Sequence, residues 1–345
     1  MINLFMSAIV FGTVILFGAL GEIITEKSGN LNLGVPGVMY LGGIAGLAVA
    51  FAYENAAANP VPIVALLLSL IAAFAAAAVG GLIFSFLTIT LRANQNVTGL
   101  TLTIFGSGVA NFFGGALNTM AGGVGQISVA VASGAYRRPI FGALSKGGWF
   151  GQIFLSHGFM VYLAIILAIL VHFFFTKTRK GLNLRAVGEN PATADAAGIN
   201  VTVYKYLATC IGAGISGLGG LYYTMDYIKG TWASEGTIEA LGWLAVALVI
   251  FATWKSLNAI WGAYLFGFLS WLYMYVSKIR ELLIEWLGLA EDALPLLKLN
   301  RSSQELFNML PYIATILVLI FVSMRKKREN QPPAHLGLPY FREER

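Results

Sequence analysis

About nine stretches of this 345-residue chain are apolar over lengths that can cross a lipid bilayer as a helix. Such a crossing takes about 20 consecutive, mostly apolar residues. Charged residues make up only 11% of the chain, against about 25% in a typical soluble domain. The pattern predicts an all-α, polytopic membrane protein with about nine transmembrane helices in a single transmembrane domain, residues 1–345. The expected spans are approximately residues 2–22, 35–52, 61–90, 98–117, 157–175, 203–224, 238–253, 257–276 and 309–324.

The basic residues indicate how these spans are oriented. An odd number of spans places the termini on opposite sides, and short loops rich in Lys and Arg stay inside the cell. Most Lys and Arg residues fall in inside loops when the C-terminus is inside, among them the cluster Arg325–Arg328. We therefore expect a multi-pass plasma-membrane protein with an irregular cytoplasmic tail at about 325–345. Basic membrane ends also explain the net charge of +6, so no nucleic-acid partner is expected. Residues 26–36 are either exposed or re-entrant.

A polar stretch, residues 177–205, interrupts the apolar runs in the middle of the chain. Asn190 is a favourable N-cap, Pro191 suits the first helical position, and Gly198 is able to end the helix. The intervening alanines, Thr193 and Asp195 have short side chains, which predicts a thin, two-turn helix between Asn190 and Gly198. A helix of this kind fits a groove on another protein.

The sequence contains no recognisable enzyme site. It has no Gly-x-x-x-x-Gly-Lys-Ser/Thr motif for nucleotide phosphates, and its histidines, 157, 172 and 335, are scattered. A serine nucleophile with a neighbouring base is absent as well. We therefore expect no catalytic residue, no metal site and no cofactor bound by this chain, and a role in moving or anchoring something.

Polar side chains at membrane depth are the better indication of function, because each is costly there unless it faces protein, water or substrate. Amides both donate and accept hydrogen bonds, which suits an uncharged polar solute, and aromatic rings stack on planar ligands. The candidates for a substrate pathway are Asn30, Asn32, Gln95, Asn96, Asn111 and Trp243. The alternative is that these amides join helices and that the aromatic side chain fills the core.

Three segments carry a resemblance to a known family: Glu26-Lys-Ser-Gly-Asn-Leu-Asn-Leu-Gly34, Leu91-Arg-Ala-Asn-Gln95, and the stretch from Gly181 to Val201. Together with Leu336-Gly-Leu-Pro-Tyr340 they resemble the permease subunits of bacterial ABC importers. The similar branch works with basic membrane protein-type binding lipoproteins and is associated with nucleosides or simple sugars.

The resemblance implies an ABC importer permease fold in which residues 188–200 are the cytoplasmic coupling helix that docks on an ABC ATPase subunit. The residues expected to carry this coupling are Gly188, Glu189, Asn190, Asp195 and Gly198. ATP and Mg would be bound by the ATPase. A second permease subunit, expected to be a paralogue, and an extracytoplasmic substrate-binding lipoprotein complete the assembly, with membrane lipids around it. The chain departs from the family pattern at Pro36, Asn183 and the pair Ala252-Thr253, where relatives usually have an acidic residue, a basic residue and two glycines.

Three other functions stay open. An ion-coupled secondary transporter needs a carboxylate or ion pair within its spans, and only Glu22 and Glu239 come close. An ABC permease for a flavin-like compound would share the same fold. A membrane-anchored scaffold or enzyme is disfavoured by the missing catalytic cluster.

Overall fold

The computed structural model describes residues 2–120, 127–232, 236–287, 301–325 and 330–341. Every regular element within these ranges is helical. The helices are α1 (Ile2–Glu26), α2 (Val35–Ala56), α3 (Pro62–Ser85), α4 (Gln95–Met120), α5 (Ala130–Arg137), α6 (Gly148–Phe154), α7 (Phe159–Lys177), α8 (Arg179–Glu189), α9 (Pro191–Ala196), α10 (Val201–Tyr222), α11 (Thr237–Phe251), α12 (Ser256–Leu272), α13 (Val276–Leu287), α14 (Arg301–Asn308) and α15 (Leu310–Arg325). Short helical turns follow α3 (Phe86–Thr90), α5 (Gly142–Lys146), α10 (Tyr223–Tyr227) and α12 (Tyr273–Tyr275).

Six helical segments are long and apolar enough to cross a membrane. They are Ile2–Glu26, Val35–Ala56, Pro62–Thr90, Gln95–Met120, Phe159–Lys177 and Ser256–Trp286. Thr237–Phe251 and Leu310–Phe321 are shorter apolar helices. The expectation of an all-helical, polytopic membrane protein is therefore confirmed, whereas the count of nine spans stays a prediction. Helix α10 has 22 residues, and its glycines, tyrosines and Lys205 lower its mean hydropathy.

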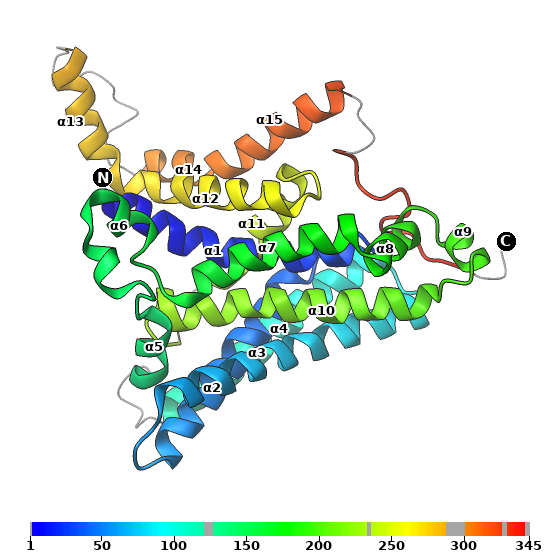
Figure 1. Cartoon of the computed structure of the whole chain (residues 1–345), viewed down its shortest axis with the longest axis horizontal. Coiled ribbons are helices and arrows are strands. Elements are labelled where there is room, and N and C mark those ends of the chain that lie inside the picture. The colour runs from blue at the N-terminus through cyan, green and yellow to red at the C-terminus, as the bar shows by residue number, and fades with distance from the viewer. Residues whose placement is uncertain (1, 121–126, 233–235, 288–300, 326–329, 342–345) are drawn as a thin grey trace.

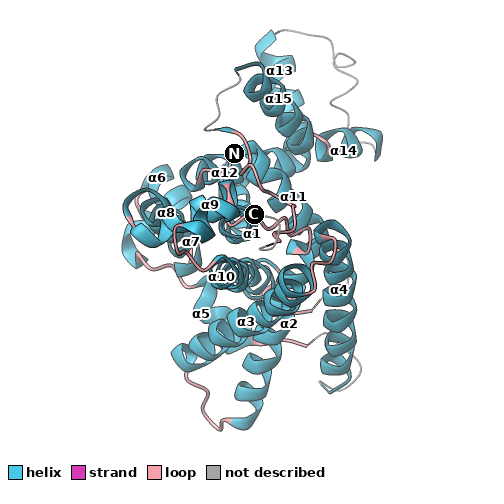
Figure 2. Ribbon diagram, turned by 90° about the vertical axis from the view of Figure 1, so that its right-hand side faces the viewer, coloured by secondary structure: helices cyan, strands magenta, loops and turns pink. Residues whose placement is uncertain are grey.

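Helix α10 lies at the centre of the bundle and packs against α1, α2 and α3 (Figures 1 and 2). Its second half, from Gly212 to Tyr222, is buried without interruption. Helix α1 is likewise buried from Gly12 to its end and also contacts α12 and α11. The core of the protein is thus an apolar helix pair, α1 and α10, enclosed by the other helices.

Glycines allow α1 and α10 to approach until their backbones touch. A Cβ atom on Gly212 would lie only 2.5 Å from the carbonyl oxygen of Gly21, and one on Gly21 would lie 2.1 Å from the carbonyl oxygen of Gly212. A similar contact joins α2 and α4, where a Cβ on Gly106 would lie 2.3 Å from the Gly37 carbonyl oxygen. Close helix packing through small residues, as expected in lipid, is the arrangement observed.

We expect Gly212→Val to destabilise the folded protein by about 1–3 kcal/mol or more, because the added methyl groups force α1 and α10 apart. Gly108→Val is the matched control, since nothing lies within 4 Å of a Cβ built on Gly108. Thermal unfolding followed by size-exclusion chromatography in detergent compares the two variants. Equal unfolding temperatures would contradict the close α1–α10 contact.

The start of α1 and the described residues 330–341 lie at opposite ends of the bundle. In Figure 1 the N-terminus lies beside α6, whereas α8, α9 and the C-terminal residues gather at the far end. The turn between α1 and α2, residues 27–34, reaches the same far end, because Gly29 there accepts a hydrogen bond from the backbone of Gly337. We call this region the α8–α9 end.

Candidate functional site at the α8–α9 end

Helix α9 is capped as its sequence predicts. The Asn190 side chain accepts a hydrogen bond from the Thr193 backbone N–H at 3.0 Å, and Pro191 occupies the first turn. After the helix, Gly198 has a φ angle of +81°, a left-handed conformation that glycine adopts at little cost. The helix, Pro191–Ala196, lies between the predicted capping residues. It is shorter than the range 188–200 that the family resemblance implies, because the preceding residues Arg179–Glu189 form the separate helix α8.

One face of α9 packs on the protein and the other is exposed. Ala194 is buried in a small cluster with Val187 and Val201. Ala196 and Ala197 are exposed. The exposed face of this short helix therefore presents small side chains, and a thin helix of this shape fits a groove in a partner protein.

The turn at residues 27–34 is held by side chains from two neighbouring helices. Glu22 of α1 accepts a hydrogen bond from the Asn32 backbone N–H at 3.0 Å. Gln95 of α4 accepts one from the Leu31 backbone N–H at 2.7 Å. The side-chain oxygen of Asn32 accepts the Gly34 N–H at 2.9 Å. These groups satisfy buried backbone donors, which agrees with the alternative that the amides join helices.

The six pathway candidates do not form one group. Asn30, Asn32 and Gln95 come together around the turn at residues 27–34 and are buried. Asn96 and Asn111 are exposed along α4, and Trp243 is half-buried on α11. Their role in a pathway stays a prediction.

A second carboxylate of α1, Glu26, accepts a hydrogen bond from the indole N–H of Trp254. Trp254 and Thr253 both have left-handed backbones, with φ angles of 56° and 52°. In the sequence, the only sign of this turn is that Ala252-Thr253 stands where the resembled family usually has two glycines. The strained turn ends α11 and directs Trp254 at the core.

We expect Thr253→Gly to stabilise the protein by about 1 kcal/mol, because a left-handed backbone costs a side-chain-bearing residue about that much more than glycine. Ala252→Gly is the control. Ala252 has an ordinary helical backbone, with φ of −73°, so glycine there is expected to destabilise by about 0.5–1 kcal/mol. Thermal unfolding measures both effects, and a lower unfolding temperature for Thr253→Gly would contradict the strain.

The last described residues, 333–341, form a segment that we call the C-terminal strap. Its backbone crosses the α8–α9 end: the His335 N–H donates to the Gly188 carbonyl at 3.0 Å, and the Gly337 N–H donates to the Gly29 carbonyl at 3.1 Å. The described residues 333–341 form no long helix, and the expectation of an irregular tail at about 325–345 stays a prediction. Its docking on the bundle was not expected from the sequence.

Side chains of the strap continue this contact. The Tyr340 hydroxyl donates to the Asp195 carboxylate at 2.9 Å, and the Arg92 guanidinium lies 4.5 Å from the centre of the Phe341 ring. Glu189 accepts a hydrogen bond from the strap backbone at Ala334, at 3.4 Å. Three of the predicted coupling residues, Gly188, Glu189 and Asp195, therefore contact the strap.

We expect the strap to loosen as pH falls below about 6.5. Burial lowers the pKa of His335 from its usual value, and the positive charge of Lys205 lowers it further. An acidic group, Glu189, also lies beside this part of the strap, and its carboxylate accepts a hydrogen bond from the backbone N–H of Ala334, the residue before His335. A histidine with a depressed pKa in the docked state stays neutral there, whereas the released strap takes up a proton near pH 6.5. Docking is thus at full strength above that pH and weakens below it.

Hydrogen exchange of the His335 and Gly337 amides, corrected for the intrinsic pH dependence, measures this loosening. Exchange is expected to accelerate between pH 7.5 and 5.5 in the unmodified chain. It is expected to be much less pH-dependent in His335→Gln, which cannot titrate in this range. Equal pH dependence in both proteins would refute the role of His335.

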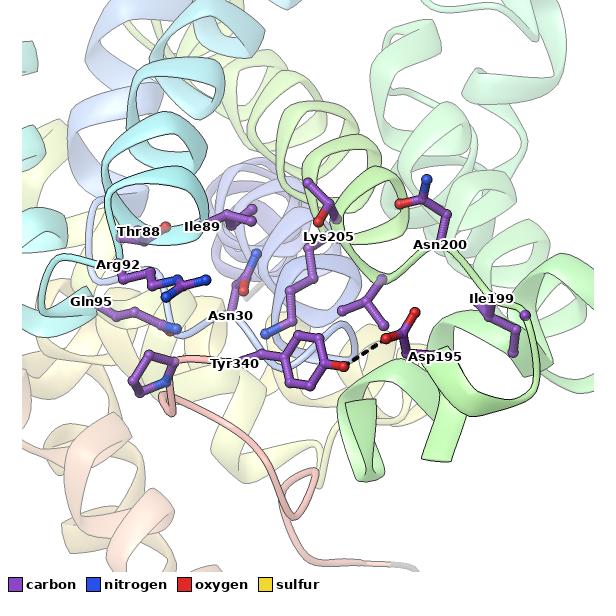
Figure 3. A pocket seen from close by; sticks show the side chains of 14 residues that line it. Asn30, Thr88, Ile89, Arg92, Gln95, Asp195, Ile199, Asn200, Lys205 and Tyr340 are labelled. Atoms are coloured by element: carbon purple, nitrogen blue, oxygen red, sulfur yellow. Dashed lines mark hydrogen bonds between the residues drawn. The ribbon is translucent and has the colours of Figure 1, made fainter. Parts of the chain in front are cut away.

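A cavity of about 450 Å³ opens between the strap, α9 and the ends of the long helices (Figure 3). Asn30, Arg92, Gln95, Lys205 and Tyr340 are among the residues that line it. Lys205 is only 3% exposed although its ammonium group faces this cavity. The α8–α9 end thus combines an exposed capped helix, a docked strap and a basic cavity.

The chain as a whole is similar to known transport proteins. Residues 4–319 match the family model described as branched-chain amino acid transport system / permease component. The chain is 32% identical to a putative glucose ABC transporter permease protein of Haloferax volcanii, over 91% of this chain and 89% of the relative. It is 31% identical to a guanosine ABC transporter permease protein of Bacillus subtilis, over 98% and 96%. A nucleoside ABC transporter permease protein of Lactococcus lactis is 29% identical over 90% and 89%.

No solved structure matches the chain. The family model covers most of the sequence, and the three relatives align with it almost from end to end. The chain therefore belongs to the permease-component family of the branched-chain amino acid transport system type.

Proposed function

We propose that the protein is the permease subunit of an ATP-driven importer that moves a nucleoside, or a simple sugar, across the plasma membrane. Helix α9 is the observation that carries the proposal. It is rigidly capped by Asn190, faces outward with small side chains such as Ala196, and lies at the end opposite the N-terminus. Such a helix transmits movement of a docked ATPase to the spans only if it is held firmly, and its caps and the buried Ala194 hold it.

The α8–α9 end is cytoplasmic in this proposal. The basic residues that follow α15 favour the same orientation. An odd number of spans, such as nine, would place the start of α1 and residues 330–341 on opposite sides of the membrane, and Figure 1 has them at opposite ends of the bundle. Residues 188–200 then include the coupling helix, with α9 as its ordered part.

The partners follow from the same proposal. The ABC ATPase carries ATP and Mg, and an extracytoplasmic lipoprotein delivers the solute. Helices α3 and α4 expose large apolar side chains, among them Ile71, Val79, Ile104 and Phe112. A second permease subunit, paralogous to this one, and membrane lipids would together cover these faces.

The pathway is best placed along α4. Asn96 and Asn111 are exposed amides on a helix that also carries Gly108 and Gly115, at neither of which a Cβ would meet a neighbour. Amides on the outer face of a membrane helix are costly unless they meet protein, water or solute. Asn30, Asn32 and Gln95 would instead fix the turn at residues 27–34, which joins α1 to α2.

The names of the relatives guide the choice of solute to be tested. We propose reconstitution of the chain with its ATPase, second permease and lipoprotein in proteoliposomes, with labelled guanosine, glucose and riboflavin as solutes. ATP-dependent uptake of guanosine or glucose supports the proposal. Uptake of riboflavin alone would favour the flavin-like alternative, and uptake that needs a proton gradient but no ATPase would establish an ion-coupled transporter instead.

A further inference from the structure

We propose that the cavity beneath the C-terminal strap is a binding site for a small phosphate monoester that also carries hydroxyl groups, such as a sugar phosphate. This site lies at the α8–α9 end, where Gln95 at the start of α4 forms part of its wall, and it does not depend on which solute crosses the membrane.

A buried cation is the first reason. Lys205 is only 3% exposed, yet its ammonium group points into the cavity (Figure 3). Among the described residues it has no hydrogen-bond or ion-pair partner. A buried charge is costly unless it is paired. The Arg92 guanidinium, placed by the left-handed backbone of Arg92 and by its contact with the Phe341 ring, lines the same cavity.

The N-terminus of α10 is a second, independent source of positive potential. Asn200, Val201 and Thr202 form part of the cavity wall. The Asn200 side chain caps the Val203 N–H at 3.1 Å. The N–H groups of the first turn otherwise lack helical partners and attract anions, as does the helix dipole of a 22-residue helix.

Acceptors in the wall define the rest of the ligand. The Asn30 side chain is fully buried, and its amide nitrogen donates to Thr209 at 2.9 Å, but its oxygen has no partner. Asp195 also faces the cavity, where it accepts the Tyr340 hydroxyl. An unpartnered buried acceptor is costly, so a ligand that brings hydroxyl donors as well as negative charge matches this wall.

Charge and size then select a phosphate monoester. The lining holds two cations, Arg92 and Lys205, and the N-terminus of α10 against one carboxylate, Asp195, which already accepts the Tyr340 hydroxyl. A monoester carries about −1.5 to −2 charges near pH 7, which balances this excess of positive charge better than a ligand with one carboxylate does. The volume of about 450 Å³ is far more than inorganic phosphate requires and lies within the usual range for small-molecule sites.

The test is binding of glucose 6-phosphate and ribose 5-phosphate to the purified full-length chain with any co-purifying subunits, measured by equilibrium dialysis. Sugar phosphates are chosen because nucleotides would also bind an ATPase. Lys205→Met is expected to weaken binding by at least about tenfold, since a charge-assisted hydrogen bond is worth that much. Thr202→Glu, an exposed change that adds negative charge to the cavity wall without disturbing the core, is expected to do the same. Lys180→Met, an exposed lysine of α8 outside the cavity, removes the same charge and is expected to stay within about twofold of the unmodified chain.

Three results would overturn the proposal. The first is absence of binding, or binding that neither Lys205→Met nor Thr202→Glu weakens. The second is binding of inorganic phosphate as tight as that of the esters, which would leave the Asn30 acceptor without a role. The third is loss of sugar-phosphate binding in phosphatidylglycerol nanodiscs but not in phosphatidylcholine nanodiscs, which would assign the site to a lipid headgroup.

Discussion

Ala196→Trp is expected to lower ATP-dependent uptake and solute-stimulated ATPase activity by at least about tenfold while leaving the protein folded in the membrane. Ala196 lies on the exposed side of α9, so the indole does not disturb the packing of Ala194 inside the chain. If the helix docks in a groove of the ATPase, the large side chain costs about 1–3 kcal/mol or more of docking energy, and 1.4 kcal/mol is a factor of ten.

Ala58→Trp is the matched control for this prediction. Ala58 is an exposed alanine in the loop between α2 and α3, at the opposite end of the bundle. Its replacement is expected to leave uptake unchanged. Asp195 is a poorer choice for this test, because its carboxylate accepts the Tyr340 hydroxyl and its loss also releases the strap. Normal uptake by Ala196→Trp would rule out coupling through the exposed face of α9.

Glu22→Leu is expected to destabilise the protein by about 1–3 kcal/mol, whereas Glu22→Gln is expected to be nearly neutral. Glu22 is 1% exposed and accepts the N–H of Asn32, which is equally buried. Leucine removes the acceptor and leaves a buried backbone donor without a partner. The amide oxygen of glutamine retains the acceptor.

The same two variants test whether the protein is an ATP-driven permease subunit or an ion-coupled secondary transporter. A coupling carboxylate must change its charge during transport, so Glu22→Gln would then abolish uptake without affecting stability. Thermal unfolding and uptake measured on both variants distinguish the two roles. Full uptake by a stable Glu22→Gln protein is the expected result, and loss of uptake would favour the ion-coupled alternative.

The sequence predicted those features that depend on neighbouring residues. Apolar length predicted the long helices, and Asn190, Pro191 and Gly198 predicted the boundaries of α9 because caps act within a few residues. The glycines of α1 and α10 indicated close packing, although not which pairs, such as Gly21 and Gly212, would meet.

The remaining features depend on contacts between distant parts of the chain. Gln95 reads as a pathway amide when it is considered alone, but its acceptor oxygen is occupied by the Leu31 N–H. Asn30 and Thr209 are likewise paired across just over half of the sequence. The strap is short and lacks helical periodicity, so its docking on Gly29 and Gly188 leaves no mark in the pattern of the tail.

The strap also bears on how the protein is made. The Gly29 carbonyl accepts the Gly337 N–H, and Gly29 is synthesised long before Gly337 because the two residues lie more than 300 positions apart in the chain. Long-range contacts of this kind cannot form until both segments exist. The α8–α9 end is therefore completed only after the strap has been synthesised. A truncated chain that has already inserted its helices would present an unfinished surface to its ATPase, which would keep incomplete permeases out of assembled transporters.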